Sequence, residues 1–196
     1  KSTFLRQNAL LILMAHMGYD IPCQKAVIWK TDKIFSRVGA GDNIYLGQST
    51  FMVEMQEVAF ILRNATKKSF IIIDEVGRGT STYDGMGLAW SILQYIHEDI
   101  KAKTLFATHY HEIIDHAKIL WWVKNYSVAV GENNENIVFL RKIIPGWMKK
   151  SYGIEVAKLA WLPEKVLKDA KNMMQSLEKS TNFHQLSLWE LSTIPS

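Results

Sequence analysis

Three short segments carry residue types that could act together on a triphosphate. The first is Lys1-Ser2-Thr3, which precedes an amphipathic stretch and matches the end of a Walker A loop whose glycines are absent. A lysine ammonium can reach terminal phosphates, the next hydroxyl can bind magnesium, and a helix N-terminus favours the anion. The tripeptide alone is a weak signal, because it occurs often by chance.

The second segment is the apolar run 70–73, which ends in Asp74-Glu75. A run without alternation predicts a strand buried on both faces, as in a parallel sheet. An aspartate at its end can hold Mg²⁺ directly or through water, and the adjacent glutamate can orient or deprotonate an attacking water. For this motif alone, a buried strand with two solvated acids is the favoured interpretation.

The third segment is the apolar run 104–107, which leads into Thr108-His109. An imidazole there could touch a γ-phosphate and report its presence. A lone histidine at a strand end is usually structural. The three segments together, however, follow the order found in ATPases of the ATP-binding-cassette type, and the combination is far more specific than any one of them.

Composition bounds the class of protein. The 196 residues suit one domain with a small appendage, and 48% hydrophobic residues suit a packed core. The net charge of +4 permits nucleic acid as a partner without requiring it. The single cysteine, Cys23, excludes a disulfide framework and a Cys-built zinc site. Without an initiator methionine, a signal peptide or an apolar run of about 18 residues, we expect a fragment that does not span a membrane.

Hydrophobic periodicity places these segments on a series of elements. Helices are predicted over residues 4–17, 51–64, 86–99, 152–160 and 163–179. Strands are predicted over residues 26–28, 33–38, 69–73 and 104–107, with a hairpin of 123–130 and 137–144 around a loop at 131–136. Loops are predicted at 39–43 and 77–85. The alternation of strand and helix predicts a βαβ unit, hence an α/β fold with a mostly parallel sheet flanked by helices.

The start of the second predicted helix has two features of its own. Ser49 or Thr50 can cap it, and Glu54 is expected near the positive end of its dipole.

Five segments resemble motifs of the MutS family of DNA mismatch-repair proteins in amino-acid sequence. Residues 49–55 resemble the family's signature segment, 74–85 its Walker B motif and following loop, and 106–110 its switch-histidine segment. Residues 33–40 and 151–154 match two further family blocks. The resemblance covers about residues 1–180, and it is specific because several matches exceed six consecutive residues.

The resemblance implies a P-loop NTPase of the ATP-binding-cassette type. Residues 1–150 would be the ATPase domain without its first strand and Gly-rich loop, 151–180 a helix-turn-helix, and 181–196 a flexible tail. In this family the helix-turn-helix packs on the partner subunit, which we favour over DNA reading. The expected cofactors are ATP and Mg²⁺, although a chain without the phosphate-cradling glycines should bind ATP poorly.

The resemblance also implies roles for individual residues around the nucleotide. Lys1 would bind the β- and γ-phosphates with Thr3 nearby, while Ser2 and Asp74 would hold the magnesium. These roles require the start of the first helix to lie beside the end of the strand at 70–73.

Four further roles concern hydrolysis and the partner subunit. Glu75 would activate the water and His109 would sense the γ-phosphate. Ser49 would reach the γ-phosphate of the neighbouring subunit's ATP, and the loop 77–81 would cross the dimer interface near it.

Family members are homodimers that detect mispaired bases, use ATP to become sliding clamps and recruit later factors such as a MutL-type protein. Mismatched double-stranded DNA would be bound mainly by domains missing here. The expected location is the bacterial cytoplasm, associated with the nucleoid. The tail carries a second, weaker resemblance, to the short peptide with which bacterial repair proteins dock on the replication sliding clamp: Gln185, Leu186, Leu188 and Trp189. A tail without this role is about as probable on five residues.

Tryptophan is the chain's main departure from the family. Trp29, Trp122, Trp147 and Trp161 stand where the family usually has glycine, and Trp121 is a candidate fifth case. We hypothesise that the source organism reads UGA as glycine and that this translation assigned it tryptophan; UGG codons throughout would rule this out. Ordinary divergence is the alternative.

Two other functions remain open at the level of sequence. A MutS paralogue that acts on recombination intermediates would share these motifs, but residues 49–55 and the pair His109-Tyr110 favour MutS proper. A non-catalytic dimerisation fragment would have lost turnover, and the intact Asp74 and Glu75 argue against that reading.

Overall fold

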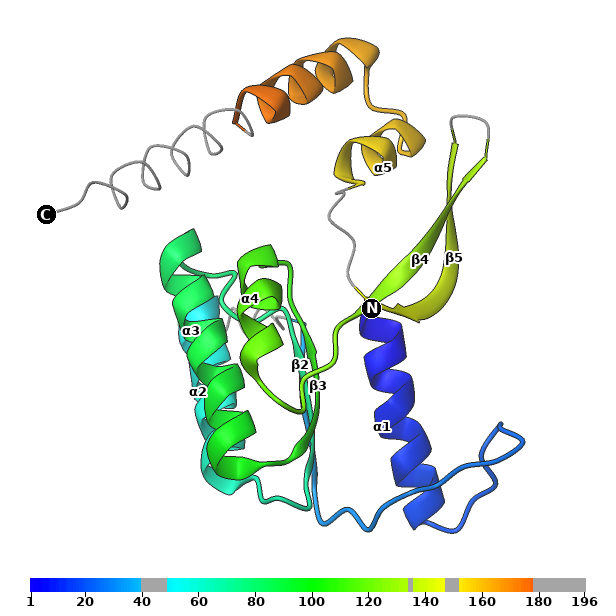
Figure 1. The fold of residues 1–196 in the computed structure, drawn as a ribbon, viewed down its shortest axis with the longest axis vertical. Helices are drawn as coiled ribbons and strands as arrows, with labels where there is room; N and C mark the ends of the chain where they lie inside the picture. The colour runs from blue at the N-terminus through cyan, green and yellow to red at the C-terminus, as the bar shows by residue number, and fades with distance from the viewer. Residues whose placement is uncertain (40–48, 134–135, 147–151, 178–196) are drawn as a thin grey trace, which may run out of the picture. The chain divides into compact units, whose positions relative to one another are not determined.

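The structure is a computed structural model that describes residues 1–39, 49–133, 136–146 and 152–177 (Figure 1). They divide into two compact units, Lys1–Asn125 and a second unit that begins at Tyr126. The expected tail at 181–196, Gln185, Leu186, Leu188 and Trp189 among it, lies outside the described residues, as does Trp147. The domain boundary expected at residue 150 stays a prediction.

The first unit is built on a parallel sheet, which confirms the predicted α/β class. Its strands are β1 (Ile34–Val38), β2 (Phe70–Asp74) and β3 (Lys103–Ala107), and they lie in the order β1-β2-β3. The register aligns Val38, Asp74 and Ala107 at the carboxyl edge of the sheet. The predicted βαβ unit is therefore present.

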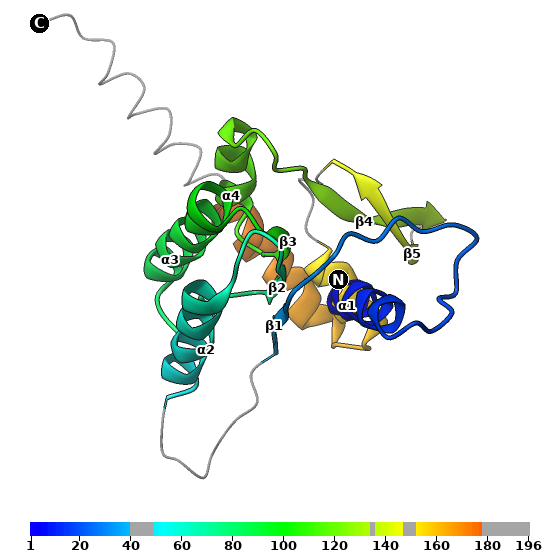
Figure 2. The same cartoon turned by 90° about the horizontal axis from the view of Figure 1, so that it is seen from below.

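Helices cover both faces of this sheet (Figure 2). Helix α1 (Ser2–His16) lies on one face, and α2 (Thr50–Asn64), α3 (Thr82–Tyr95) and α4 (His111–His116) lie on the other. Ile71 and Ile73 of β2 pack against the three-helix side, whereas Phe70 and Ile72 pack against α1. The prediction of a strand buried on both faces is confirmed.

The segment after β2 differs from the prediction, because helix α3 begins at Thr82 rather than at residue 86. Ser81 caps it: its Oγ accepts the Asp84 N–H at 3.3 Å and donates to Asp84 Oδ2 at 2.8 Å. The glycines suggested a loop up to residue 85, but this capping interaction starts the helix earlier. The helix then continues through a π-helical turn, η2 (Ile96–Ile100), and ends where Lys101 adopts a φ of 59°.

The strand predicted at 26–28 is wrong. These residues form an extended connection between α1 and β1 without strand pairing, and Val27 is exposed. An apolar triplet is too short for periodicity to distinguish a strand from a connecting segment. Within the described residues, no helix is long and apolar enough to cross a membrane.

The second unit contains the predicted hairpin and helices. Strands β4 (Tyr126–Asn133) and β5 (Asn136–Pro145) pair antiparallel, so Gly131 lies in a strand, opposite Val138, and not in the loop predicted at 131–136. Helix α5 (Gly153–Leu159) follows, and residues 164–177 are helical. Two helices near the predicted positions are thus confirmed.

The end of α5 bears directly on the tryptophan anomaly. Trp161 has a φ of 63°; its N–H donates to the Lys158 carbonyl at 3.0 Å, and the Leu162 N–H donates to the Ala157 carbonyl at 3.2 Å. This pair of bonds is a Schellman motif, whose left-handed position is usually glycine. The expectation of a glycine-type backbone at this helix end is confirmed for Trp161.

The other tryptophans in question have different settings. Trp29 packs edge-on against Phe70 with a ring separation of 5.7 Å, and Lys103 Nζ lies 4.5 Å from its ring centre. Trp121 and Trp122 are exposed. The recoding hypothesis therefore has backbone support at Trp161 and stays a hypothesis at the other positions.

Replacing Trp161 with glycine should stabilise the second unit by about 1 kcal/mol, because glycine relieves the left-handed strain. Trp161→Gly and Trp121→Gly form a matched pair, since both indoles are 92% exposed and Trp121 does not have a positive φ. Urea unfolding followed by circular dichroism should show a gain for Trp161→Gly alone. Equal effects of the two substitutions would contradict the backbone explanation.

Candidate functional site

The first residue of the chain lies beside the end of β3. Lys1 precedes α1, and its Nζ donates to the carbonyl oxygen of Thr108 at 3.5 Å. Ser2 is the first residue of α1, so its backbone belongs to the group of N–H donors that a helix leaves unpaired. The structure therefore brings Lys1 to the segment that contains His109, and Ser2 follows it along the chain. Thr3 is in the same first turn and is exposed.

The acid pair is fixed by the ladder between β2 and β3. Asp74 ends β2 opposite Ala107, and the Glu75 N–H donates to the Ala107 carbonyl at 2.9 Å. Glu75 has a φ of 57°, a left-handed conformation that non-glycine residues adopt rarely and that is found preferentially at functional sites. Among the described residues, the Asp74 carboxylate has no hydrogen-bond or ion-pair partner.

Glu75 forms an ion pair with Arg78, a residue for which the sequence predicted no separate role. Arg78 Nη2 lies 2.7 Å from Glu75 Oε2, in an ion pair across three residues of the loop. The guanidinium is mostly exposed and the carboxylate is partly buried. The spacing of an acid and an arginine three residues apart was visible in the sequence, but the loop conformation that joins them was not.

His109 lies within reach of the charges of all these groups. Partial burial lowers the pKa of His109 below its usual 6.5, and the positive charges of Arg78 and Lys1 lower it further, while Glu75 opposes them. At neutral pH the imidazole is therefore neutral, with one nitrogen able to donate and one able to accept. Its ring also lies 4.1 Å from that of Tyr110. Lys1, Glu75, Arg78 and His109 thus form one electrostatic group.

Ser49 belongs to a different element from these residues. It stands at the N-cap of α2, but its hydroxyl makes no capping hydrogen bond and the residue is exposed. The position predicted for the cap is right, whereas the capping interaction is absent within the described residues. Of the predicted site residues, the structure places Lys1 and Glu75 beside the end of β3 that leads to His109, and Ser49 at the start of another helix.

The site suits a phosphate and a hard cation. Mg²⁺ usually takes one or two protein oxygens together with phosphate oxygens and waters. The Asp74 carboxylate and the Ser2 hydroxyl are oxygens of this kind, and Lys1 adds a positive charge at a helix N-terminus. This edge of the sheet is where open α/β sheets generally bind ligands.

A cavity elsewhere in the first unit lacks these groups. About 450 Å³ of space lies between α1, the connection at 21–29 and the edge of β3. Its lining is apolar apart from a few groups such as Lys25 and Lys103, and it includes none of the residues Lys1, Asp74, Glu75 or His109.

Comparison with known proteins gives one consistent family. The family described as MutS domain V matches residues 1–178. DNA mismatch repair protein MutS of Clostridioides difficile (strain 630) is 56% identical over 188 residues, which cover 96% of this chain and 20% of that protein. The MutS protein of Thermodesulfovibrio yellowstonii (strain ATCC 51303 / DSM 11347 / YP87) is 58% identical over 179 residues, covering 91% and 21%. The chain spans about a fifth of the length of these curated relatives.

The charges around His109 should be separable by substitution. Arg78→Gln removes a cation and should raise the pKa of His109, whereas Glu75→Gln removes an anion and should lower it. An NMR titration of the imidazole measures both shifts. Each substitution also frees the other partner of the ion pair, which adds to the shift in the same direction. Shifts of equal sign, or none, would show that the three side chains do not share a site.

Proposed function

Since this chain belongs to the MutS domain V family, the ATPase domain of DNA mismatch-repair proteins, we propose that it binds ATP at the carboxyl edge of the β1-β2-β3 sheet and takes part in its hydrolysis. One observation carries the proposal: Lys1 bonds to the Thr108 carbonyl while Glu75, Arg78 and Lys1 all act on the His109 imidazole. This arrangement supports the proposal, because it offers a cation for the phosphates, an acid for the water and a neutral imidazole.

The first step is binding of the triphosphate. The ammonium of Lys1 would contact the β- and γ-phosphates, with Thr3 and the free N–H groups of the first turn of α1 nearby. Ser2 and Asp74 would hold a magnesium ion, which supplies charge neutralisation of the phosphates when bound. Helix α1 has no acidic residue in its first turn that would repel the anion.

Hydrolysis would then use Glu75 and His109. The Glu75 carboxylate would accept a proton from water as the water oxygen attacks the γ-phosphorus and the bond to the β-phosphate oxygen breaks. The ion pair with Arg78 occupies Oε2 of Glu75, so Oε1 would be the oxygen that accepts the proton. Neutral His109 would donate a hydrogen bond to a γ-phosphate oxygen, which suits a sensor of that group.

Glu75→Gln in the full-length protein should slow ATP hydrolysis on the order of 10²-fold, because the amide cannot take the proton. ATP binding should change little. Lys1→Ala is the matched contrast, and it should weaken ATP binding itself. Steady-state ATPase assays and equilibrium binding of a fluorescent ATP analogue measure the two effects. Unchanged turnover of Glu75→Gln would overturn the role of Glu75 and with it the proposed mechanism.

The wider role is that of the relatives, whose printed name is DNA mismatch repair protein MutS. The proposed assembly is a homodimer in which Ser49 reaches the partner's ATP and the loop 77–81 lies near the dimer interface. The helices from Gly153 to residue 177 would add a dimer contact, in keeping with the absence of buried side chains in α5 within the described chain. Mismatched DNA and a MutL-type factor are the proposed further partners.

The residues Gln185, Leu186, Leu188 and Trp189 support a weaker proposal, docking on a bacterial replication sliding clamp. A peptide of residues 181–196 should bind the purified clamp, and Leu188→Ala with Trp189→Ala should abolish binding because the two apolar anchors are lost. Fluorescence anisotropy measures the affinity. Absence of binding up to about millimolar peptide would end this proposal without touching the ATPase site.

Neither alternative function gains a specific observation. The relatives compared are named as mismatch-repair proteins, which favours MutS over a paralogue acting on recombination intermediates. The acid pair and imidazole at one site favour a catalytic domain over a dimerisation fragment without turnover.

A further inference from the structure

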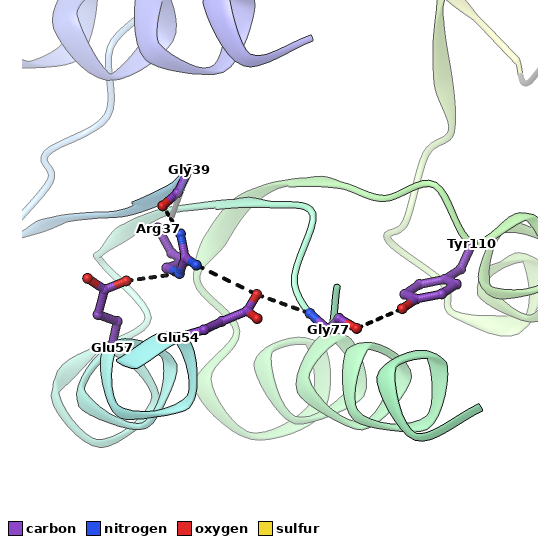
Figure 3. A network of polar contacts seen from close by, with 6 residues as sticks. All are labelled: Arg37, Gly39, Glu54, Glu57, Gly77 and Tyr110. Atoms are coloured by element: carbon purple, nitrogen blue, oxygen red, sulfur yellow. Dashed lines mark hydrogen bonds and ion pairs between the residues drawn. The ribbon is translucent and has the colours of Figure 1, made fainter. Parts of the chain in front are cut away.

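A largely buried polar network holds the segment that follows Glu75 (Figure 3). Its centre is Gly77, two residues after Glu75 and directly before Arg78. The Gly77 N–H donates to Glu54 Oε1 of α2 at 3.1 Å, and the Gly77 carbonyl accepts the Tyr110 hydroxyl at 2.9 Å. Both backbone groups of Gly77 are thus bonded by side chains from other parts of the fold. Glu54 comes from α2, and Tyr110 directly follows His109.

Packing leaves this peptide little freedom. Gly77 has a φ of 90°, and a Cβ there would lie 2.6 Å from the Gly85 carbonyl oxygen. A Cβ on Gly85 would in turn overlap the Gly77 carbonyl and the Tyr110 hydroxyl. Val76, immediately before, is 1% exposed in the core. The loop that carries Glu75 and Arg78 is therefore clamped against α3, α2 and Tyr110.

Glu54 is itself placed by β1. Glu54 and Arg37 are each 5% exposed, and Arg37 Nη2 lies 3.7 Å from Glu54 Oε1. Arg37 also bonds to the Gly39 carbonyl. Its Nε lies 2.9 Å from Glu57 Oε2, but the N–H is not aligned for a hydrogen bond, so this is a charge contact. A buried carboxylate with a cation beside it remains a strong acceptor for the Gly77 N–H. Burial of the Tyr110 hydroxyl raises the pKa of Tyr110, and the negative charge of Glu54 raises it further.

We propose that Glu54 and Tyr110 are positioning residues for hydrolysis. By bonding to the N–H and to the carbonyl of Gly77, they hold Glu75 in the position that it needs as a base. The proposal rests on the proposed function, because it assigns Glu75 the role of base. Helix α2 begins directly after Ser49, so a displacement of this helix would be passed through Glu54 to the loop of Glu75. Tyr110 passes the position of the neighbouring His109 to the same peptide.

The network therefore makes turnover depend on the position of α2 and of the His109 segment. In the proposed function ATP binding depends instead on Lys1, Ser2 and Asp74, which make none of the hydrogen bonds or ion pairs of this network in the described chain. Loss of either hydrogen bond to Gly77 should lower kcat and leave KM for ATP nearly unchanged. A residue that only supported the fold would not separate the two constants in this way.

The test is a steady-state ATPase assay on the full-length protein with Tyr110→Phe, Glu54→Ala and Glu54→Gln. Tyr110→Phe removes one oxygen and keeps the ring against His109, and it should lower kcat about tenfold, the scale of one lost hydrogen bond to a constrained group. Glu54→Ala should lower kcat at least as much. Glu54→Gln keeps an oxygen that can accept the Gly77 N–H, so it should restore most of the loss despite the missing charge.

Glu57→Ala is the matched control, since Glu57 lies on the same helix and faces the same Arg37 but does not touch Gly77. Its kcat should equal that of the unaltered protein. A loss as large as that of Glu54→Ala would assign the effect to Arg37 and overturn the proposal. An equal loss in Glu54→Gln and Glu54→Ala would also overturn it.

Glu75→Gln, measured in parallel, separates this inference from the proposed function. If Glu75→Gln abolishes turnover while Tyr110→Phe and Glu54→Ala retain full kcat, the positioning role is wrong and the base assignment stands. If Glu75→Gln turns over normally, the proposed function fails first. Should Glu54→Ala not fold, Tyr110→Phe decides alone, because removal of one hydroxyl leaves the packing intact.

Discussion

Burial of β2 on both faces is the constraint on which the rest of the domain depends. Ile71, Ile72 and Ile73 have no exposed surface, and burial of each isoleucine contributes about 1.5–3 kcal/mol. A strand that is apolar on both faces must lie between two layers of helices, and its parallel neighbours then end at the same edge. The first polar residues after it, Asp74 and Glu75, can only emerge at that edge. The position of the acid pair is thus a consequence of packing.

The sequence predicted most of this layout because its signals are local or periodic. The apolar runs of β2 and β3, and the helical spacing in α1 and α2, each lie within a dozen or so residues. Predictions failed where the local signal was ambiguous. At residues 26–28 an apolar triplet lies in an extended connection, and at 82–85 a capping serine overrides the helix-breaking tendency of glycine. The boundaries of the hairpin differ by a few residues, since its strand pairing and not its composition sets them.

The residues of the proposed site also divide into those that the sequence predicted and those that it did not. Residue types at Lys1, the acid pair and His109 indicated phosphate chemistry. The parallel register places the acid pair beside the end of β3 that leads to His109, and the bond to Thr108 brings Lys1 there. The contacts made by Glu54 and Tyr110 were not predictable, because they join Gly77 across 23 and 33 residues of chain. Glu54 was expected to favour the dipole of α2, yet it lies beyond the first turn and its carboxylate is used by a loop. Tertiary contacts of this kind leave no periodic trace in a sequence.

The close approach of Gly77 and Gly85 also restricts how this domain can vary. Neither backbone has room for even a methyl group, so neither residue can change to adjust the loop between them. Substitutions that adjust the turnover rate must therefore occur in surrounding side chains. Their size or polarity can alter the hydrogen bonds that hold the Gly77 backbone. Homologues that differ in turnover would then share both glycines and diverge in the neighbours of α2 and α4.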